Sequence, residues 1–465
     1  MQSGTVPKIW NQAIVVPIFK KGVSSNPKNY RPISLTCVGS KIFESGIKRL
    51  LVPFLEGKKL LSINQHGFRA KHSTCINLLE CLNEWTANLD AKTNTFVAHI
   101  DFSRAFDTVP LPKLMHKLKN AGVADNLFSC IHSMLFGRSQ RVKVGNSFSV
   151  PLIVKSGVPQ GSVLGPILFI FYINDLTEAV VPPSTPKLYA DDLKAFCSDK
   201  NDKGGKTFND TLTNIAAWAS NWQLVISNEK SKWLLISNYR NDPEQIKYEF
   251  NLGGEIFPRV TDVLDLGVNF TSRLSFSNHI TIMITKAKQR LFLLNKCFLS
   301  RNPKLLILAF KTYVIPLLEY CSPVWNPQNI QDIKRIESVQ RMFTKRLIGF
   351  ESLNYPARLE RARLCTLELR RLRADLSLCY NILHGLVETP ISNFFAVHTN
   401  NPTRGHSWKL KSTVPRLDCR QHFFSHRIIN VWNALSQKTV DSSSTAMFRA
   451  RLKTESLEEF LYIKE

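Results

Sequence analysis

The stretch Leu188-Tyr189-Ala190-Asp191-Asp192-Leu193 places two adjacent acidic residues between apolar flanks. Short β-like runs over 187–189 and 193–196 lie on either side, so a tight hairpin would present both aspartates at its tip. In a polar loop such a pair would carry little information. Here the acids interrupt a half-buried strand pattern, where charge is costly unless something compensates it. A divalent cation would provide that compensation.

A second acidic stretch, Val97-Ala98-His99-Ile100-Asp101-Phe102-Ser103-Arg104-Ala105-Phe106-Asp107, ends an apolar run in Asp101 close to the expected start of a helix. An aspartate at a strand end can present its carboxylate to solvent or metal while the strand stays buried. Taken alone, this segment is explained better by a helix N-cap carboxylate. Asp101 precedes Asp191 by 90 residues, so a shared site would have to be assembled by folding.

A third stretch, Ser156-Gly157-Val158-Pro159-Gln160-Gly161-Ser162-Val163-Leu164-Gly165-Pro166, contains glycines on both sides of a Pro-Gln pair. Such a backbone can be approached closely by a substrate. A surface turn that leads into a buried helix over 167–176 is the alternative explanation. A glycine-rich loop by itself is therefore weak evidence.

The chemistry that these stretches could share is phosphoryl transfer. Mg²⁺ is a hard cation that takes oxygen ligands and keeps positions for water and phosphate. Two such ions, about 3.5–4 Å apart, can activate an attacking 3′-hydroxyl and stabilise a leaving pyrophosphate. The reaction then needs little beyond positioning and charge neutralisation.

The charge of the chain indicates a polyanionic partner. Lys and Arg number 61 against 36 Asp and Glu, which gives a net charge of +25. Release of counterions from nucleic acid is the usual source of affinity for so basic a protein. A merely basic protein, or one that binds acidic membranes, has the same composition. The basic excess is pronounced between Lys286 and Asp375, which makes this region the better candidate for gripping a phosphate backbone.

Length and composition predict a globular intracellular protein. The 465 residues fit two or three subdomains. The longest apolar runs are far too short for a membrane span, and no signal peptide is recognisable at the N-terminus. No pair of the 10 cysteines has CxxC spacing, so we expect reduced thiols and no structural zinc site.

Hydrophobic patterns predict an α+β fold. Up to about residue 275, short β-like runs alternate with helical stretches, and the strand candidates are 13–19, 95–100, 141–144, 187–189, 193–196 and 233–236. Residues 276–386 turn helical. There Asn302-Pro303 is expected to start one helix, and Gly349 to end another. The segment 387–465 is rich in Ser, Thr and Asn before a short aromatic tail.

Together these patterns resemble the reverse transcriptases of non-LTR (LINE-like) retrotransposons, near the jockey-like branch. The match runs in order along nearly the whole chain. Further stretches that resemble the family's motifs are Pro17–Gly22, Asn29–Leu35, Gln65–Arg69, Ser73-Thr74, Tyr172–Leu176, Leu266–Val268, His422–Arg427 and Val431–Asn433. Tyr189-Ala190-Asp191-Asp192 corresponds to the signature box.

The resemblance implies a right-hand polymerase: fingers, a palm built on an antiparallel sheet, and a helical thumb. Residues 1–275 would form fingers and palm, 276–386 the thumb, and 387–465 a C-terminal segment of unknown role. The implied activity is RNA-directed DNA polymerisation, with an RNA template, a DNA primer and deoxynucleoside triphosphates as partners and no membrane. The implied location is the nucleus, with a cytoplasmic ribonucleoprotein stage.

The resemblance also implies roles for individual residues. Asp101 and Asp191 would hold two Mg²⁺ ions, for which Mn²⁺ can substitute, and Asp192 would support them. The remaining roles are triphosphate contact (Lys20, Arg31), exclusion of the ribose 2′-hydroxyl (Phe106), lining of the nucleotide and template (Gln160, Gly161) and protonation of the leaving pyrophosphate (Lys230). Each has a plainer alternative. Arg31 would otherwise form a surface salt bridge, Phe106 would belong to the core, and Lys230 would be a solvated surface residue.

Two departures from the family pattern bear on function. Ser227 stands where the family usually has Asn, in Trp222–Lys230. The chain also begins almost at the fingers, so we expect the family's endonuclease to be absent from it. An inactive, truncated relic that still binds nucleic acid is the alternative function. A viral RNA-dependent RNA polymerase shares the paired acids, but bulky Phe106 argues against ribonucleotides. A structural or membrane-binding basic protein leaves the ordered motifs unexplained.

Overall fold

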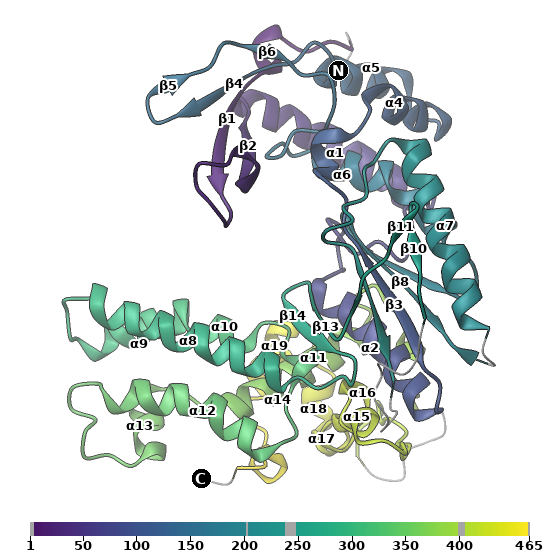
Figure 1. Cartoon of the computed structure of the whole chain (residues 1–465). Helices are drawn as coiled ribbons and strands as arrows, with labels where there is room; N and C mark the ends of the chain where they lie inside the picture. Colours follow the sequence, from purple (N-terminus) through teal and green to yellow (C-terminus); the bar gives the residue numbers. More distant parts are fainter. Residues whose placement is uncertain (1–3, 201–202, 238–247, 399–404, 464–465) are drawn as a thin grey trace. The chain divides into compact units, whose positions relative to one another are not determined.

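The computed structural model describes the chain except for residues 1–3, 201–202, 238–247, 399–404 and 464–465 (Figure 1). Helices and sheets are both well represented, which confirms the predicted α+β class. The chain divides into two compact units. The first contains the residues up to Ala70, Phe96–Trp233 and the segment that ends at Arg259. The second contains Lys71–Thr95, a short segment from Leu234 and Val260–Glu465. The boundaries expected near residues 275 and 386 stay a prediction.

The sheet that carries the signature box has the strand order β12-β9-β3-β8-β7. Its centre is apolar because β3 is buried except at His99, and β8 is buried over 193–197. Strands β7 and β8 form an antiparallel hairpin with Tyr189 opposite Asp192. The strands predicted at 95–100, 187–189, 193–196 and 233–236 are confirmed as β3 Thr95–Ile100, β7 Thr185–Tyr189, β8 Asp192–Ser198 and β9 Lys232–Ile236. Strand β12, Arg259–Val260, was not predicted.

A second sheet of the first unit has the order β2-β1-β4-β5, with β6 also paired to β4. The strands predicted at 13–19 and 141–144 belong to it. The strands of this second sheet are β1 Gln12–Phe19, β2 Tyr30–Leu35, β4 Ser139–Val144, β5 Ser147–Phe148 and β6 Leu152–Ile153. A separate two-stranded sheet is formed by β10 Asn251–Leu252 and β11 Glu255–Ile256. The helices of this unit are α1 Val38–Gly57, α3 Ala105–Thr108, α4 Leu111–Asn120, α5 Asp125–Leu135, α6 Gly165–Tyr172 and α7 Gly204–Trp222.

The second unit is mainly helical, as predicted for 276–386. Asn302 caps α9 by accepting the Lys304 N–H at 2.9 Å, which confirms the predicted start. Helix α12 ends at Lys345, before the Gly349 expected to stop it. The elements of this unit are α2 Thr74–Asp90, β13 Asp262–Asp265, β14 Val268–Thr271, α8 Ser277–Cys297, α9 Pro303–Tyr313, α10 Ile315–Glu319, α11 Ser322–Trp325, α12 Ile330–Lys345, α13 Tyr355–Ala362, α14 Leu367–Leu383, α15 Asp418–Gln421, α16 Phe424–Arg427, α17 Ile429–Ala434, α18 Gln437–Val440 and α19 Thr445–Arg451.

The C-terminal segment is part of the core of the helical unit. Arg427 donates to both carboxylate oxygens of Asp375 at 3.0 Å each, and Asp375 is 1% exposed. Arg427 also donates to the carbonyl of Pro323 at 2.9 Å. A buried carboxylate is tolerated because this guanidinium compensates its charge. All 10 cysteines are free thiols, and no described helix is both long and apolar enough to cross a membrane.

Candidate active site

The two predicted metal-binding acids lie at the ends of neighbouring strands. Strand β3 ends at Ile100, so Asp101 follows it directly, and Asp191 lies in the tight turn of the β7–β8 hairpin. Strands β3 and β8 are adjacent in the sheet. The N-cap interpretation of Asp101 is wrong, because the N-cap of the next helix, α3, is Arg104. Asp101 is therefore a strand-end carboxylate.

Asp191 has the electrostatic environment of a cation ligand. Burial raises the pKa of its carboxyl group, and the negative charge of Asp101 raises this pKa further. Lys230 and Arg31 act in the opposite direction and lower the pKa. Two carboxylates that repel each other in a partly desolvated place are stabilised by a bound cation. The oxygen donors fit a hard divalent ion.

The segment after α7 holds Asp101 from the other side. Lys230 Nζ lies 2.9 Å from Asp101 Oδ1, with the lysine side chain 64% exposed. Ser231 Oγ accepts the Asp101 N–H at 3.1 Å. The backbone N–H of Ser227 donates to the carbonyl of Asp101 at 2.8 Å. Because Ser227 acts here through its main chain, its departure from the family's Asn leaves this contact intact.

Asp192 and the predicted triphosphate contacts are exposed. Asp192 opens strand β8 beside the turn. Arg31 pairs with Ile18 where β1 and β2 run antiparallel, and its positive charge lowers the pKa of Asp191. The charge of Lys20 lowers the pKa of Asp107, although burial makes that pKa higher than usual overall. The charges of Arg31 and Lys20 thus act on Asp191 and Asp107, respectively, while their contact with a triphosphate stays a prediction.

The loop over residues 156–166, which contains Gln160 and Gly161 and is called the Gln-Gly loop below, packs on the segment that follows Asp101. The N–H groups of Gly157 and Val158 donate to the carbonyls of Val109 and Phe106, both at 2.8 Å. Gln160 Nε2 donates to Asp107 Oδ1 at 3.0 Å. A Cβ on Gly157 would lie 2.6 Å from the carbonyl oxygen of Asp107, so only glycine fits this approach.

Gly161 and Phe106 are both constrained by close packing. Gly161 has φ +113°, and a Cβ there would meet the carbonyl oxygen of Ser34 at 2.6 Å. The ring of Phe106 is stacked on Phe169 with centroids 4.1 Å apart and is only half-buried. Phe106 is therefore supported by the core while part of its surface is open, and the predicted roles of both residues stay predictions.

Sequence reasoning missed two acids that position the loop. Glu44, only 3% exposed, accepts the N–H groups of Val163 and Leu164 at 2.6 and 3.0 Å, just before α6 begins. Asp107 orients Gln160 as described. A signal for Glu44 existed, since it lies at helical spacing with three apolar residues of α1, Ile47, Leu51 and Leu55.

In the described part of the chain, no three His, Cys, Asp or Glu side chains converge as a ready metal cage.

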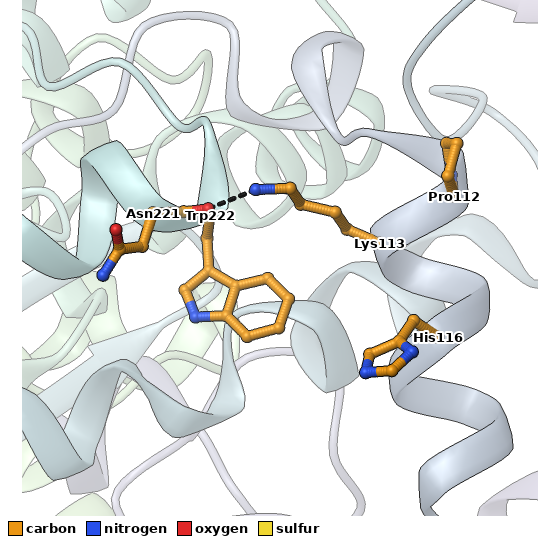
Figure 2. A pocket seen from close by; sticks show the side chains of 5 residues that line it. All are labelled: Pro112, Lys113, His116, Asn221 and Trp222. Atoms are coloured by element: carbon orange, nitrogen blue, oxygen red, sulfur yellow. Dashed lines mark hydrogen bonds between the residues drawn. The ribbon is translucent and has the colours of Figure 1, made fainter.

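A separate pocket of the first unit contains none of the predicted site residues. Figure 2 shows its lining, Pro112, Lys113, His116, Asn221 and Trp222, with Lys113 donating to the carbonyl of Asn221. Beside it, Lys117 Nζ lies 3.6 Å from the ring centroid of Trp222 and 2.6 Å from Asp175 Oδ1. The contact of Lys117 with Trp222 joins α4 to α7.

Comparison with known proteins gives one family match. Residues 18–269 match the family described as reverse transcriptase (RNA-dependent DNA polymerase). Three similar proteins come from Drosophila melanogaster. They are probable RNA-directed DNA polymerases from transposon BS (29% identical over 72% of this chain) and from transposon X-element (30% over 74%), and the RNA-directed DNA polymerase from mobile element jockey (27% over 74%). The chain covers 38% of the length of each.

Among solved structures, a telomerase from Candida tropicalis in complex with a fragment of telomeric RNA aligns over 97% of this chain and 65% of that chain. The TM-score is 0.48 and the sequence identity 10%.

Proposed function

Because the chain belongs to the reverse transcriptase (RNA-dependent DNA polymerase) family, we propose that it adds deoxynucleotides to a primer 3′-hydroxyl on an RNA template. The expected resemblance to reverse transcriptases of non-LTR elements is confirmed by the Drosophila relatives. The observation that carries the proposal is the pair Asp101 and Asp191. They lie at adjacent strand ends, and the negative charge of Asp101 raises the pKa of Asp191. Such a pair is stabilised by a divalent cation, which members of this family generally use.

In the proposed reaction the primer oxygen forms a bond to the α-phosphorus of the incoming nucleotide while the bond to pyrophosphate breaks. Asp101 and Asp191 would hold Mg²⁺, which when bound activates the attacking hydroxyl and stabilises the leaving pyrophosphate. Arg31 and Lys20 would bind the triphosphate, for which a planar guanidinium is well suited. Lys230 would donate a proton to the departing pyrophosphate, since its ammonium is exposed next to Asp101.

Selection between nucleotides is proposed to depend on Phe106. Its ring cannot retreat, because it stacks on Phe169 and meets the edge of Phe68 with centroids 6.1 Å apart. A 2′-hydroxyl would therefore have to displace a supported ring. The RNA template and DNA primer would be bound through phosphates, for which the net charge of +25 is suited.

The test is primer extension on an RNA template with Mg²⁺, with deoxy- and ribonucleotides in parallel. Asp191→Ala is expected to abolish extension. A matched control is Asp210→Ala, which removes an exposed carboxylate of α7 and is expected to keep activity. Phe106→Ala is expected to admit ribonucleotides. Extension that survives in Asp191→Ala would overturn the two-metal assignment, and a parent chain that binds RNA–DNA duplex without extending it would favour an inactive relic.

We further propose a nuclear location with a cytoplasmic ribonucleoprotein stage. The support is the strongly basic charge, which suits a protein carried on RNA and used on DNA. Imaging of a fluorescent fusion of the chain tests it, and exclusion from the nucleus would contradict it.

A further inference from the structure

The turn that carries Asp191 has an unfavourable backbone conformation. Ala190 adopts φ +58°, in the left-handed region that residues with a Cβ rarely enter. In two-residue hairpin turns a positive φ at the first position is normally supplied by glycine. A strain of this size shifts a conformational population by about fivefold or more. Something must therefore hold Ala190 in place.

Gln65 provides that restraint with its whole amide group. The side chain is 0% exposed. Its Nε2 donates to the carbonyl oxygen of Ala190 at 3.2 Å, and its Oε1 accepts the N–H of Ala190 at 2.9 Å. The same Oε1 accepts the N–H of Gly67 at 2.7 Å. One buried amide thus satisfies both backbone groups of the strained residue, which fixes the orientation of the peptide units on either side of it.

The chain around Gln65 is itself anchored to strand β7. The N–H of His66 donates to the carbonyl of Leu188, and the N–H of Leu188 donates to the carbonyl of Asn64, both at 2.9 Å. A Cβ on Gly67 would lie 2.4 Å from the backbone nitrogen of Ala190, so this approach requires glycine. The segment therefore runs beside β7 up to the turn and delivers the amide of Gln65 to Ala190.

We propose that Gln65 is a positioning residue for the reaction: it holds the strained Ala190 turn and thereby places the Asp191 carboxylate for metal binding. This role rests on the proposed polymerase function. Gln65 acts through Ala190 and makes no contact with substrate. A glutamine is needed because a donor and an acceptor must reach the same residue from one buried side chain; glutamate would lack the donor and bury a charge.

The decisive test is a rescue. Gln65→Leu removes the hydrogen bonds, and misplacement of Asp191 is expected to lower kcat about 100-fold, with a much smaller change in the KM for nucleotide. Adding Ala190→Gly removes the Cβ strain, so it is expected to recover about fivefold of that loss. Ala190→Gly in the parent chain, where the turn is already held, is expected to change kcat less than it does in Gln65→Leu. Gln65→Met, which removes the hydrogen bonds but keeps the length of the side chain and buries no charge, is the second variant.

A second readout is independent of polymerisation. Binding of Mn²⁺ alone to the full chain, followed by electron paramagnetic resonance, is expected to weaken in Gln65→Leu and to recover in Gln65→Leu/Ala190→Gly. If the parent chain does not extend primers, the proposed function fails, but this pattern still decides the role of Gln65. Gln340→Leu is the matched control. It also removes a fully buried amide, on α12, and is expected to leave Mn²⁺ affinity unchanged.

The proposal would be overturned if Ala190→Gly changed kcat and Mn²⁺ affinity by the same factor in the parent chain and in Gln65→Leu. So would a Gln65→Leu chain with the parent's kcat and Mn²⁺ affinity. If Gln65→Leu does not fold, as judged by circular dichroism, Gln65→Met with and without Ala190→Gly decides. Failure of both Gln65 variants to fold, with Gln340→Leu folded, would make Gln65 a general structural residue and refute the positioning role.

Discussion

The contact of Glu44 with the Gln-Gly loop leads to a prediction with a local readout. The carboxylate reaches from α1 to the start of α6, where it accepts two backbone N–H groups, those of Val163 and Leu164. Its other oxygen accepts the Ser40 hydroxyl at 3.1 Å. A negative charge at this place also favours the helix dipole of α6. Glu44→Gln keeps the shape of the side chain but replaces one acceptor oxygen with an NH₂ group.

The magnitude follows from the hydrogen bonds that are weakened. Both N–H groups donate to one oxygen, Oε2, which the amide oxygen of Glu44→Gln replaces while the new NH₂ group faces the Ser40 hydroxyl. A hydrogen bond to a charged group contributes about 1.5–3 kcal/mol against about 0.5–1.5 kcal/mol for a neutral one, so weakening both bonds costs about 1.5–3 kcal/mol together. The cost is local, because the rest of α1 remains packed through Ile47, Leu51 and Leu55, which are each 0% exposed. We therefore expect the loop to open more often while the fold of the chain is kept.

Hydrogen exchange measured by mass spectrometry on a peptide that spans Val163 and Leu164 is the appropriate assay. Where opening and closing are fast, exchange reports the free energy of local opening. A cost of about 1.5–3 kcal/mol corresponds to about 10- to 150-fold faster exchange. Glu56→Gln, which changes the other acid of α1, where Glu56 pairs with Arg69 at 2.7 Å, is the matched control. It is expected to leave the loop peptide unchanged.

Parent-like exchange at Val163 and Leu164 in Glu44→Gln would refute the reasoning, since it would mean that the carboxylate contributes nothing to the loop. Equal acceleration in Glu56→Gln would refute it as well, because the effect would then come from α1 as a whole.

Three further predictions concern the acids of both units. Burial raises the pKa of Asp191, so this group favours folding at low pH, and that contribution is lost as the pH rises through its folded-state pKa. Without metal at neutral pH, Asp191→Asn should therefore have a melting temperature no lower than that of the parent chain. Added Mg²⁺ should raise the melting temperature of the parent chain alone. An equal rise in the parent chain and in Asp191→Asn would contradict this prediction. Asp107→Ala is expected to lower primer extension about tenfold, because it removes the acceptor that orients Gln160. The double variant Asp107→Ala/Gln160→Ala should extend primers no worse than either single variant. Additive losses would show that the two residues do not act together. Arg427→Met leaves Asp375 buried without its partner and should cost about 3–5 kcal/mol, seen as an earlier denaturant transition of the helical unit, while Asp375→Asn/Arg427→Met should recover part of that loss.

The strands, the hairpin and the candidate acids could be predicted from the sequence because their signals are local. Short apolar runs indicated β1, β3 and β9, and two acids between apolar flanks indicated a turn at Asp191. The loop's supports were not predicted. An isolated Glu on a helix is usually solvated, and burial of Glu44 depends on α6, more than a hundred residues away.

Helix α2 illustrates the same limit at the scale of domains. Lys71–Thr95, which contains α2, belongs to the same compact unit as the later helices. Trp85 of α2 packs edge-on against Phe270 with centroids 5.6 Å apart, and both rings are fully buried. An amphipathic helix shows that it has an apolar face, but its sequence does not say which partner will cover that face.

By itself, the sequence determined which chemistry is available: paired carboxylates, a Gly-Gln loop, and a charge suited to nucleic acid. These depend on residue types and short spacings, which the chain carries whatever its fold. Only the tertiary structure decided that Asp101 ends a strand and caps no helix, and that Ala190 is strained and held by Gln65. Burial, backbone strain and the approach of residues distant in the chain arise when packing removes water, and no local pattern encodes them.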